Sequence, residues 1–368
     1  MNTKIGYICS STSWGGLEMN QLRNAIWMQQ RGHRVVVLCQ QNAPIHIQSV
    51  AANLPVQLIQ KHRKYYDFAA GKKLAKLIQA QEISHLITRD TRDLSLGAIA
   101  KTFAGKKAFH FSYFMEMQLG VKKTNLLHTI RFRQLDLWSC PLNWLEKQVH
   151  TLTRFSKSKT TVIPSGLDLH PFSSAQTQTD ARAKLELPLD KIIVGLIGRF
   201  DPHKGQVLLL EALTKIQDPQ VCVCLLGEPT RNEGTAYFDK IQSTIAENKL
   251  QNRVFIRPFR EDIASFYRAI DVFVMASKAE TFGMVTIEAM ASGTPTVGSN
   301  AGGTPEILQF GELGYLFEPL NATSLADNIQ KFVENPSAID RKTLQEVARK
   351  YDHNHVCELV ERELHLTQ

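Results

Sequence analysis

The stretch from Ala276 to Gly303, ASKAETFGMVTIEAMASGTPTVGSNAGG, decides the fold of this chain. The apolar run DVFVMAS, residues 271–277, leads into it and is typical of a buried parallel strand. From Phe282 onward, apolar residues recur at helical spacing, and Gly293 followed by a proline marks the end of that helix. Residues 294–297 predict the next strand. The stretch therefore predicts a strand, a loop, a helix and a strand in succession.

The entrance of this predicted helix combines glutamates with a glycine. The unpaired N–H groups and the positive dipole end of a helix N-terminus suit a phosphate. Gly283 has no side chain that would keep an anion away. Glu280 stands just outside the entrance and Glu288 inside the helix, where each carboxylate can accept hydrogen bonds from hydroxyl groups. A single glutamate here would only balance the dipole or face solvent, but the pair beside Phe-Gly favours a binding site.

The nonapeptide ETFGMVTIE resembles the E-x7-E motif of the retaining glycosyltransferases of family 4, also called glycosyltransferase group 1. That family has the GT-B fold, in which two Rossmann-like domains face a central cleft. The resemblance implies that Glu280 meets the donor sugar and Glu288 the nucleotide ribose. It implies that the pyrophosphate is received by the backbone of Phe282, Gly283, Met284 and Val285. One departure is Ala276, which stands where the family usually has proline.

The segment KIIVGLIGRFDPHKG, residues 191–205, predicts a buried strand followed by a basic loop. It lacks the Walker A pattern but is similar to the family's G-R-x4-K-G, which implies diphosphate binding by Arg199 and Lys204. Two such cations stabilise the charge that develops on a departing diphosphate without a metal ion. No Asp-x-Asp occurs in the chain. We therefore expect no metal and no cofactor besides a UDP- or GDP-linked sugar donor.

In the first part of the chain, KIGYIC (4–9) and RVVVLC (34–39) predict two parallel strands with a helix between them. Gly15 and Gly16 precede that helix outside any G-x-G-x-x-G fingerprint, so a nicotinamide site loses its main support. The resemblance implies that these glycines face the cleft and bind substrate. It also suggests, by position alone, that His110 lies close to the donor sugar and the acceptor; packing in an aromatic run is the alternative.

The domain organisation follows from the length and the resemblance. A chain of 368 residues is long enough for two domains. We expect an acceptor-side Rossmann-like domain at 1–172, a nucleotide-sugar-binding Rossmann-like domain at 173–350, and a C-terminal helix at 351–368 that packs back on the first domain. Further strands are predicted at 56–59, 84–88 and 221–228.

Charge is distributed unevenly along the chain. Residues 1–172 hold 23 lysines and arginines against 9 aspartates and glutamates, a formal charge of +14, whereas residues 173–368 hold 20 against 26, or −6. No nucleic-acid-binding module is recognisable, so we expect no nucleic-acid partner. An anionic membrane surface or a phosphorylated acceptor fits the basic half, and basic side chains that only face solvent are the alternative. Residues 122–150 suggest an amphipathic surface helix carrying Lys122, Lys123, Arg131 and Arg133, and a helix that simply covers a sheet is the alternative.

Several features bear on the location of the protein. The six cysteines are scattered through apolar runs without metal-site spacing, which favours buried thiols in a reducing compartment. No secretory leader precedes the first predicted strand, and no apolar run approaches the roughly 18 residues of a spanning helix. We expect a cytoplasmic enzyme, associated at most peripherally with the inner face of a membrane.

The sequence is compatible with three functions. The first is a retaining hexosyltransferase that moves a sugar from a nucleotide diphosphate to a glycan, lipid-linked or other cell-envelope acceptor. The second is a glycoside hydrolase that uses Glu280 and Glu288, although eight residues of helix separate them by about 12 Å, beyond the roughly 5–9.5 Å such pairs need. The third is a non-catalytic nucleotide-sugar-binding protein of the same fold.

Overall fold

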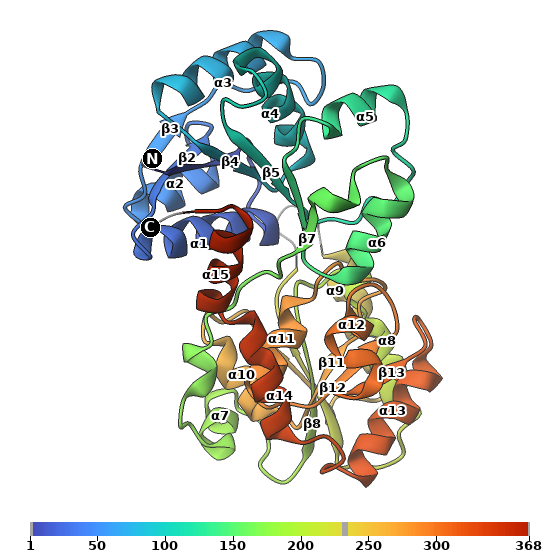
Figure 1. Ribbon diagram of the computed structural model, residues 1–368. Helices are drawn as coiled ribbons and strands as arrows, with labels where there is room; N and C mark the ends of the chain where they lie inside the picture. Colours follow the sequence, from blue (N-terminus) through green and yellow to red (C-terminus); the bar gives the residue numbers. More distant parts are fainter. Residues whose placement is uncertain (1–2, 230–234, 367–368) are drawn as a thin grey trace. The chain divides into compact units, whose positions relative to one another are not determined.

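The computed structural model describes residues 3–229 and 235–366. It divides into two compact units (Figure 1). Unit 1 consists of Met1–Gly166 and His353–Gln368, and unit 2 of Leu167–Asp352. The chain therefore passes between the units twice, after Gly166 and after Asp352.

Unit 1 is built on a seven-stranded sheet whose neighbouring strands all pair in parallel, in the order β3-β2-β1-β4-β5-β6-β7. The order reverses between β1 and β4, and in open α/β sheets ligands bind at the carboxyl ends of strands beside such a point. The strands are β1 (Lys4–Cys9), β2 (Arg34–Cys39), β3 (Val56–Leu58), β4 (His85–Thr88), β5 (His110–Phe114), β6 (Leu137–Cys140) and β7 (Thr160–Val162).

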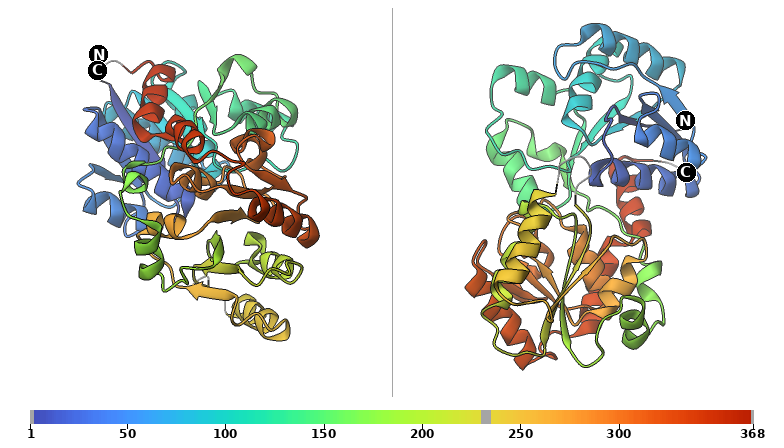
Figure 2. Two further views of the ribbon diagram at one scale, coloured as in Figure 1. Left: turned by 90° about the horizontal axis from the view of Figure 1, so that it is seen from below. Right: turned by 180° about the vertical axis from the view of Figure 1, so that it is seen from behind.

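Helices cover both faces of this sheet, because successive side chains of a strand point to opposite sides. Ile8 belongs to a core shared with α3 and α4, and Tyr7 to a core shared with α1 and α15. Figures 1 and 2 show α15, in red, against α1. The helices are α1 (Gly16–Gln30), α2 (Pro44–Ala51), α3 (Phe68–Ala80), α4 (Thr91–Ala104), α5 (Leu126–Phe132), α6 (Asn143–Leu152) and α15 (His353–Glu363).

The prediction of one amphipathic helix over 122–150 is wrong. Only α5 and α6 are helical there, and β6 lies between them. The apolar residues of this part serve the sheet: Trp138 is completely buried and its strand pairs with β5 and β7. Tertiary packing thus overrides the basic, helix-compatible pattern of the segment.

Unit 2 repeats the arrangement with six parallel strands in the order β10-β9-β8-β11-β12-β13. Its strands are β8 (Ile192–Ile197), β9 (Val221–Leu226), β10 (Val254–Arg257), β11 (Val272–Met275), β12 (Thr296–Ser299) and β13 (Tyr315–Phe317). Its helices are α7 (Gln178–Lys184), α8 (Gln206–Leu213), α9 (Ala236–Glu247), α10 (Ile263–Ala269), α11 (Met284–Ala291), α12 (Thr304–Ile307), α13 (Ala322–Glu334) and α14 (Arg341–Ala348). Both units are Rossmann-like, which confirms the predicted fold class.

Some predicted boundaries move. The strand expected at 294–297 is β12, two residues later. The C-terminal helix expected at 351–368 is α15, which begins at His353, and the carbonyl of Tyr351 before it accepts a hydrogen bond from the Leu167 N–H at 2.7 Å. All six cysteines are buried, and none of them forms a disulfide within the described residues. Among the described helices, none has both the length and the apolar character that a membrane crossing requires.

Candidate functional site

The two motifs of unit 2 follow neighbouring strands. β8 pairs with β11 at the point where the strand order reverses, so the loops after these strands begin at the same edge of the sheet. Residues 198–205 form the loop after β8, and residues 276–283 the loop after β11. Segments more than 70 residues apart in sequence thereby become neighbours.

Side-chain hydrogen bonds shape the loop after β8. The buried Gln206 amide donates to the carbonyl of Arg199 at 2.8 Å, while the Arg199 side chain is exposed. Asp201 caps a short 3-10 helix by accepting from the His203 N–H at 2.7 Å, and that helix ends at Lys204. The backbone that presents both predicted cations is therefore held in place from within the loop.

The structure brings Lys204 and Glu280 into contact. The ammonium nitrogen of Lys204 lies 3.0 Å from Oε2 of Glu280, and the side chains are 34% and 23% exposed. The pair is thus only partly desolvated, and both groups remain reachable by a ligand. A salt bridge at such exposure contributes little to stability.

The loop 300–303 fixes the backbone of Glu280. The Gly303 N–H donates to the Glu280 carbonyl at 2.8 Å, and Gly302 forms an isolated parallel bridge with Glu280. Gly302 has φ +64°, and a Cβ there would collide with the Glu280 carbonyl oxygen. Only glycine allows both the left-handed backbone and the close approach. The segment 301–303 of this loop therefore sets the position of the Glu280 backbone.

Helix α11 begins two residues later than predicted. Met284 is its first residue, and Gly283 precedes it with φ +89°, the left-handed region that glycine adopts without strain. Phe282 is 5% exposed and its ring packs edge-on against Tyr351, so it anchors the loop rather than extending the helix. The hydroxyl of Thr286, in the first turn, is buried and has no hydrogen-bond partner among the described residues.

Glu288 lies one turn further along α11. It is 8% exposed, and the hydroxyl of Tyr267 on α10 donates to its Oε2 at 2.8 Å. Complete burial and the neighbouring carboxylate raise the pKa of Tyr267 well above its usual value, so the phenol stays protonated and donates. No sequence pattern predicts this contact, since Tyr267 resembles the other core aromatic residues before β11.

Gly15 and Gly16 lie in unit 1, where the loop after β1 enters α1. The Gly15 N–H donates to Glu18 Oε2 at 3.0 Å and so caps the helix. A Cβ on Gly16 would meet no atom within 4 Å. The entrance of α1 is therefore open at the carboxyl edge of the sheet.

His110 lies at the other edge of the same sheet. It is the first residue of β5, with its ring centroid 5.3 Å from that of His85. Burial lowers the pKa of His110 to about 4, so the ring is neutral at physiological pH. Its place at the amino end of the strand separates it from Gly15 and Gly16, and the aromatic run HFSYF serves packing.

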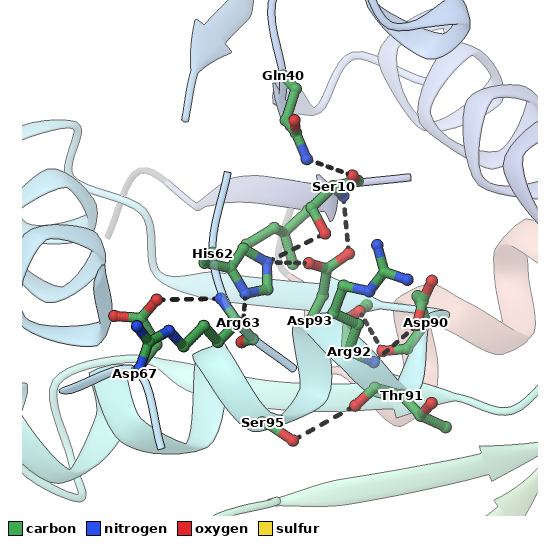
Figure 3. Close-up of polar contacts among 12 residues, drawn as sticks. Ser10, Gln40, His62, Arg63, Asp67, Asp90, Thr91, Arg92, Asp93 and Ser95 are labelled. Carbon is green, nitrogen blue, oxygen red and sulfur yellow. Dashed lines mark hydrogen bonds and ion pairs between the residues drawn. The ribbon is translucent and has the colours of Figure 1, made fainter. Parts of the chain in front are cut away.

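A buried polar cluster that sequence reasoning missed lies at the carboxyl edge of unit 1 (Figure 3). Nε2 of His62 lies 3.0 Å from Asp93 Oδ1 and 3.0 Å from Ser10 Oγ, and its Nδ1 lies 2.9 Å from the carbonyl of Arg63. The Ser10 N–H donates to Asp93 Oδ2 at 2.8 Å. The side chains of His62 and Asp93 are fully buried. The cluster fastens the loop before α3 to the residue that follows β1 and to the first turn of α4.

An ion pair involves Arg89, the residue that follows β4. Arg89 pairs with Glu116, which follows β5, while Asp90 caps α4 by accepting from the Arg92 N–H at 2.7 Å. Burial raises the pKa of Glu116, and Arg89 and Asn20 oppose that shift. The pair joins two strand ends of unit 1.

Two family models match this chain, one in each half. The model described as Glycosyltransferase Family 4 matches residues 14–170, and the model described as Glycosyl transferases group 1 matches residues 177–351. D-inositol 3-phosphate glycosyltransferase of Mycolicibacterium smegmatis is 32% identical over 206 residues, which are 55% of this chain and 46% of that protein. The enzyme of the same name from Streptomyces scabiei is 32% identical over 48% of this chain and 42% of its own length. The chain spans about half the length of the curated relatives it matches.

Solved structures resemble the whole chain. Anabaena HepE in complex with UDP and glucose has a TM-score of 0.82 at 23% identity, covering 99% of this chain and 100% of that one. A glycosyltransferase from Rickettsia africae has a TM-score of 0.84 at 19% identity, covering 100% of both chains. At such identities the likeness shows the fold, whereas the family models also match the sequence segments that form the site. The chain belongs to the family 4, or group 1, glycosyltransferases of the GT-B fold.

Proposed function

We propose that this protein is a retaining hexosyltransferase that uses a nucleotide-diphosphate sugar as donor. The observation that carries the proposal is the contact between Lys204 and Glu280 at 3.0 Å, beside the glycine-capped entrance of α11. A cation for the diphosphate and a carboxylate for the sugar hydroxyls are thereby adjacent, as they must be when one ligand joins both groups. The acceptor proposed is a glycan, a lipid-linked sugar or another cell-envelope molecule.

The diphosphate is assigned to Arg199, Lys204 and the start of α11. Arg199 is exposed on a loop fixed by Gln206, so its guanidinium is available to a ligand. The backbone from Phe282 to Val285 adds the positive end of the helix dipole. As the bond between the sugar and the β-phosphate breaks, these groups stabilise the negative charge that develops on the phosphate. We propose that this set replaces a divalent metal.

The two glutamates receive different tasks. Glu280 is partly exposed and is assigned to the donor sugar, whereas Glu288 is buried and is assigned to the ribose hydroxyls. Their separate partners, Lys204 and Tyr267, support this division. A hydrolase would need both carboxylates to face one bond and a water molecule, and the burial of Glu288 does not favour that use.

The acceptor is assigned to unit 1, with Gly15 and Gly16 at the open entrance of α1. His110 is left out because it lies at the amino end of β5. We propose a cytoplasmic protein that associates peripherally with an anionic inner membrane face and does not bind nucleic acid. The basic character of unit 1 supports the membrane association: residues 1–166 and 353–368 contain 24 lysines and arginines against 11 aspartates and glutamates, a formal charge of +13.

A panel of UDP- and GDP-sugars tests the proposal. UDP-glucose is tried first, because solved HepE structures contain UDP and glucose. Thermal shift identifies the donor, since a ligand at 100 times its Kd stabilises by about 2.7 kcal/mol. Release of the nucleoside diphosphate then reports turnover. Binding without turnover across acceptors would favour the non-catalytic protein, and hydrolysis of glycosides without a nucleotide would favour the hydrolase.

A further inference from the structure

A groove of about 490 Å³ lies on the outer side of α4 in unit 1. Its walls come from the segment before and at the start of α3 and from α5, and its floor from α4. The lining residues are mainly aromatic and aliphatic, and five large ones among them are exposed: Tyr65, Tyr66, Phe68, Leu127 and Ile130. These five side chains are between 41% and 59% exposed. Large apolar side chains gathered along one groove mark an interaction site rather than ordinary surface.

Cations without acidic partners lie around Tyr65, one of the residues that line the groove. The Arg131 guanidinium lies 5.4 Å from the centre of the Tyr65 ring, and Lys64 Nζ lies 5.4 Å from the same ring. Burial lowers the pKa of Lys123, and the nearby positive charge of Arg131 lowers it further. Within the described part of the chain, none of Lys64, Lys123 and Arg131 forms an ion pair with a carboxylate.

Over residues 3–229 and 235–366, Arg131 forms side-chain hydrogen bonds with a hydroxyl and an imidazole and with no carboxylate. Its guanidinium donates to Ser95 Oγ at 2.9 Å and lies 3.1 Å from Nδ1 of His128, and its Nε has no partner among the described residues. Burial lowers the pKa of Arg131. The pKa of His128 is lowered by burial and, in addition, by the positive charge of Arg131, which favours the neutral ring. A half-buried cation next to other cations is unfavourable unless an anion joins it.

The surrounding sequence extends the positive charge. Residues 61–73 contain five lysines and arginines and one aspartate, and residues 122–134 contain four lysines and arginines and no acid. These two segments therefore hold +8, which equals the net charge of the whole chain. An occupant of the groove should combine an apolar chain with an anionic group.

We propose that the groove binds one anionic phospholipid of a membrane surface, with its acyl chain between α4 and α5 and its phosphate at Arg131, Lys64 and Lys123. The apolar chain is covered by Tyr66, Phe68, Leu127 and Ile130, while Tyr65 lies between the apolar walls and the charged end. This inference rests on the proposed membrane association and specifies where the lipid is held. It assigns no role to the residues of the sugar-transfer site.

The test is co-sedimentation with vesicles of phosphatidylglycerol and of phosphatidylcholine. The groove variant is Leu127→Ser with Ile130→Ser. Its matched control is Ile47→Ser with Val50→Ser on α2, where both side chains are 56% exposed but outside the groove. Loss of two apolar contacts should lower partition into phosphatidylglycerol vesicles about tenfold or more. The control should stay within about twofold of the wild type.

A second variant tests the anionic end. Lys64→Gln with Lys123→Gln should lower binding to phosphatidylglycerol vesicles and leave the weak binding to phosphatidylcholine unchanged, because only the charge attraction is removed. These lysines are preferred to Arg131, whose guanidinium packs between Tyr65 and Phe132. Inorganic phosphate at millimolar concentration should not displace the wild type, because it lacks the apolar chain.

The outcomes separate the groove from the rest of the protein. Wild-type binding by the groove variant would overturn the proposal, and so would equal loss in the α2 control. A change in oligomeric state with unchanged vesicle binding would identify a second copy of the chain as the occupant. UDP affinity, measured by calorimetry, should be the same in all variants. Vesicle binding that persists in a protein without sugar-transfer activity would contradict the proposed function alone.

Discussion

At the residue scale, the proposed donor site contains a salt bridge that a ligand must share. Lys204 contacts Glu280 at 3.0 Å, and Arg199 is exposed on the same loop as Lys204. Arg199→Ala or Lys204→Ala should lower kcat by about 10²-fold, the usual effect of removing one group that stabilises developing charge. Steady-state kinetics with the donor found in the panel measures this. The exposed Lys215→Ala, also in unit 2, serves as the control. Activity within a few-fold of wild type for both site variants would contradict the assignment.

The two glutamates can be told apart by their ligands. Glu288→Ala should weaken binding of the free nucleoside diphosphate, because the ribose hydroxyls lose their acceptor. Glu280→Ala should leave that binding nearly unchanged and reduce turnover of the sugar donor. Isothermal titration with nucleotide alone, next to kinetics with the full donor, distinguishes the two. The reverse pattern would overturn both roles.

Tyr267 is expected to position Glu288. Its hydroxyl donates to Glu288 Oε2 at 2.8 Å, and its ring is completely buried, so it acts on the nucleotide only through the carboxylate. Tyr267→Phe keeps the ring and removes the hydrogen bond. KM for the donor should rise about tenfold, since a hydrogen bond to a charged group contributes about 1.5–3 kcal/mol, while kcat stays near wild type. A fall in kcat at unchanged KM would contradict a positioning role.

Charge balance at the site predicts activity without a divalent metal. Arg199, Lys204 and the α11 entrance are positive, and no Asp-x-Asp occurs in the chain to hold a bridging ion. Turnover after treatment with EDTA should therefore equal that of the untreated protein. Loss of activity that Mn²⁺ or Mg²⁺ restores would show the prediction to be wrong.

At the scale of elements, helices and strands were predicted best where one hydrophobic pattern continues without interruption over the whole element. β1, β2, β8 and β9 are apolar runs that the structure buries, and the helix predicted between the first two strands is α1. β6 was missed because its four residues lie in a basic segment, and what makes them a strand is pairing with β5 and β7. The start of α11 was misplaced because Phe282 fits the helical spacing but packs against Tyr351 instead.

The His62 cluster makes the junction of β1, α4 and the loop before α3 sensitive to pH. Burial alone lowers the pKa of His62, but the hydrogen bonds to Asp93 and to the Arg63 carbonyl outweigh it, and the pKa is raised above its usual value. A raised pKa stabilises the fold fully below the unfolded value of about 6.5. This stabilisation is lost as the pH rises through the higher folded value.

The unfolding free energy of the wild type should therefore fall as the pH rises from about 6.5 through the folded pKa of His62. The His62→Gln variant should not show this fall. The variant should also be less stable by about 2 kcal/mol below pH 6.5, because Asp93 keeps its burial but loses a charged partner. Urea unfolding at several pH values measures both effects. The exposed His170→Gln should behave like wild type. Equal pH slopes for His62→Gln and wild type would exclude the cluster as their cause.

At the scale of the molecule, the sequence predicted the two Rossmann-like units, because the strand and loop patterns recur along most of the chain. It predicted the contact of the G-R-x4-K-G and E-x7-E segments only through the family resemblance. The physical cause of that contact is the pairing of β8 with β11, which no local pattern specifies. The same holds for His62 and Asp93, which are 31 residues apart and meet through the sheet topology. The sequence of β5 likewise does not show that His110 stands at the amino end of that strand.

The distribution of charge over the whole molecule predicts salt-dependent membrane association. Unit 1 carries a formal +13, whereas unit 2, with 19 lysines and arginines against 24 aspartates and glutamates, carries −5. Each basic residue near an anionic membrane contributes about 1 kcal/mol, and the attraction fades within a Debye length of about 8 Å at physiological salt. Binding to anionic vesicles should therefore fall steeply as salt rises, while neutral vesicles bind little at any salt concentration.

Charge reversal locates the responsible surface. Of the four basic residues on 122–133, Lys122 and Arg133 are exposed, whereas Arg131 is held by Ser95 and by packing, so reversing it would also disturb the groove. Lys122→Glu with Arg133→Glu should lower binding about tenfold or more at low salt and make the remaining binding less salt-dependent. Lys215→Glu with Lys240→Glu, exposed in unit 2, makes the same change in net charge and should have little effect. Equal losses in both pairs would mean that net charge, not the surface of unit 1, drives association.

Wild-type protein left in the supernatant with anionic vesicles at low salt would rule out the membrane and favour a soluble phosphorylated acceptor.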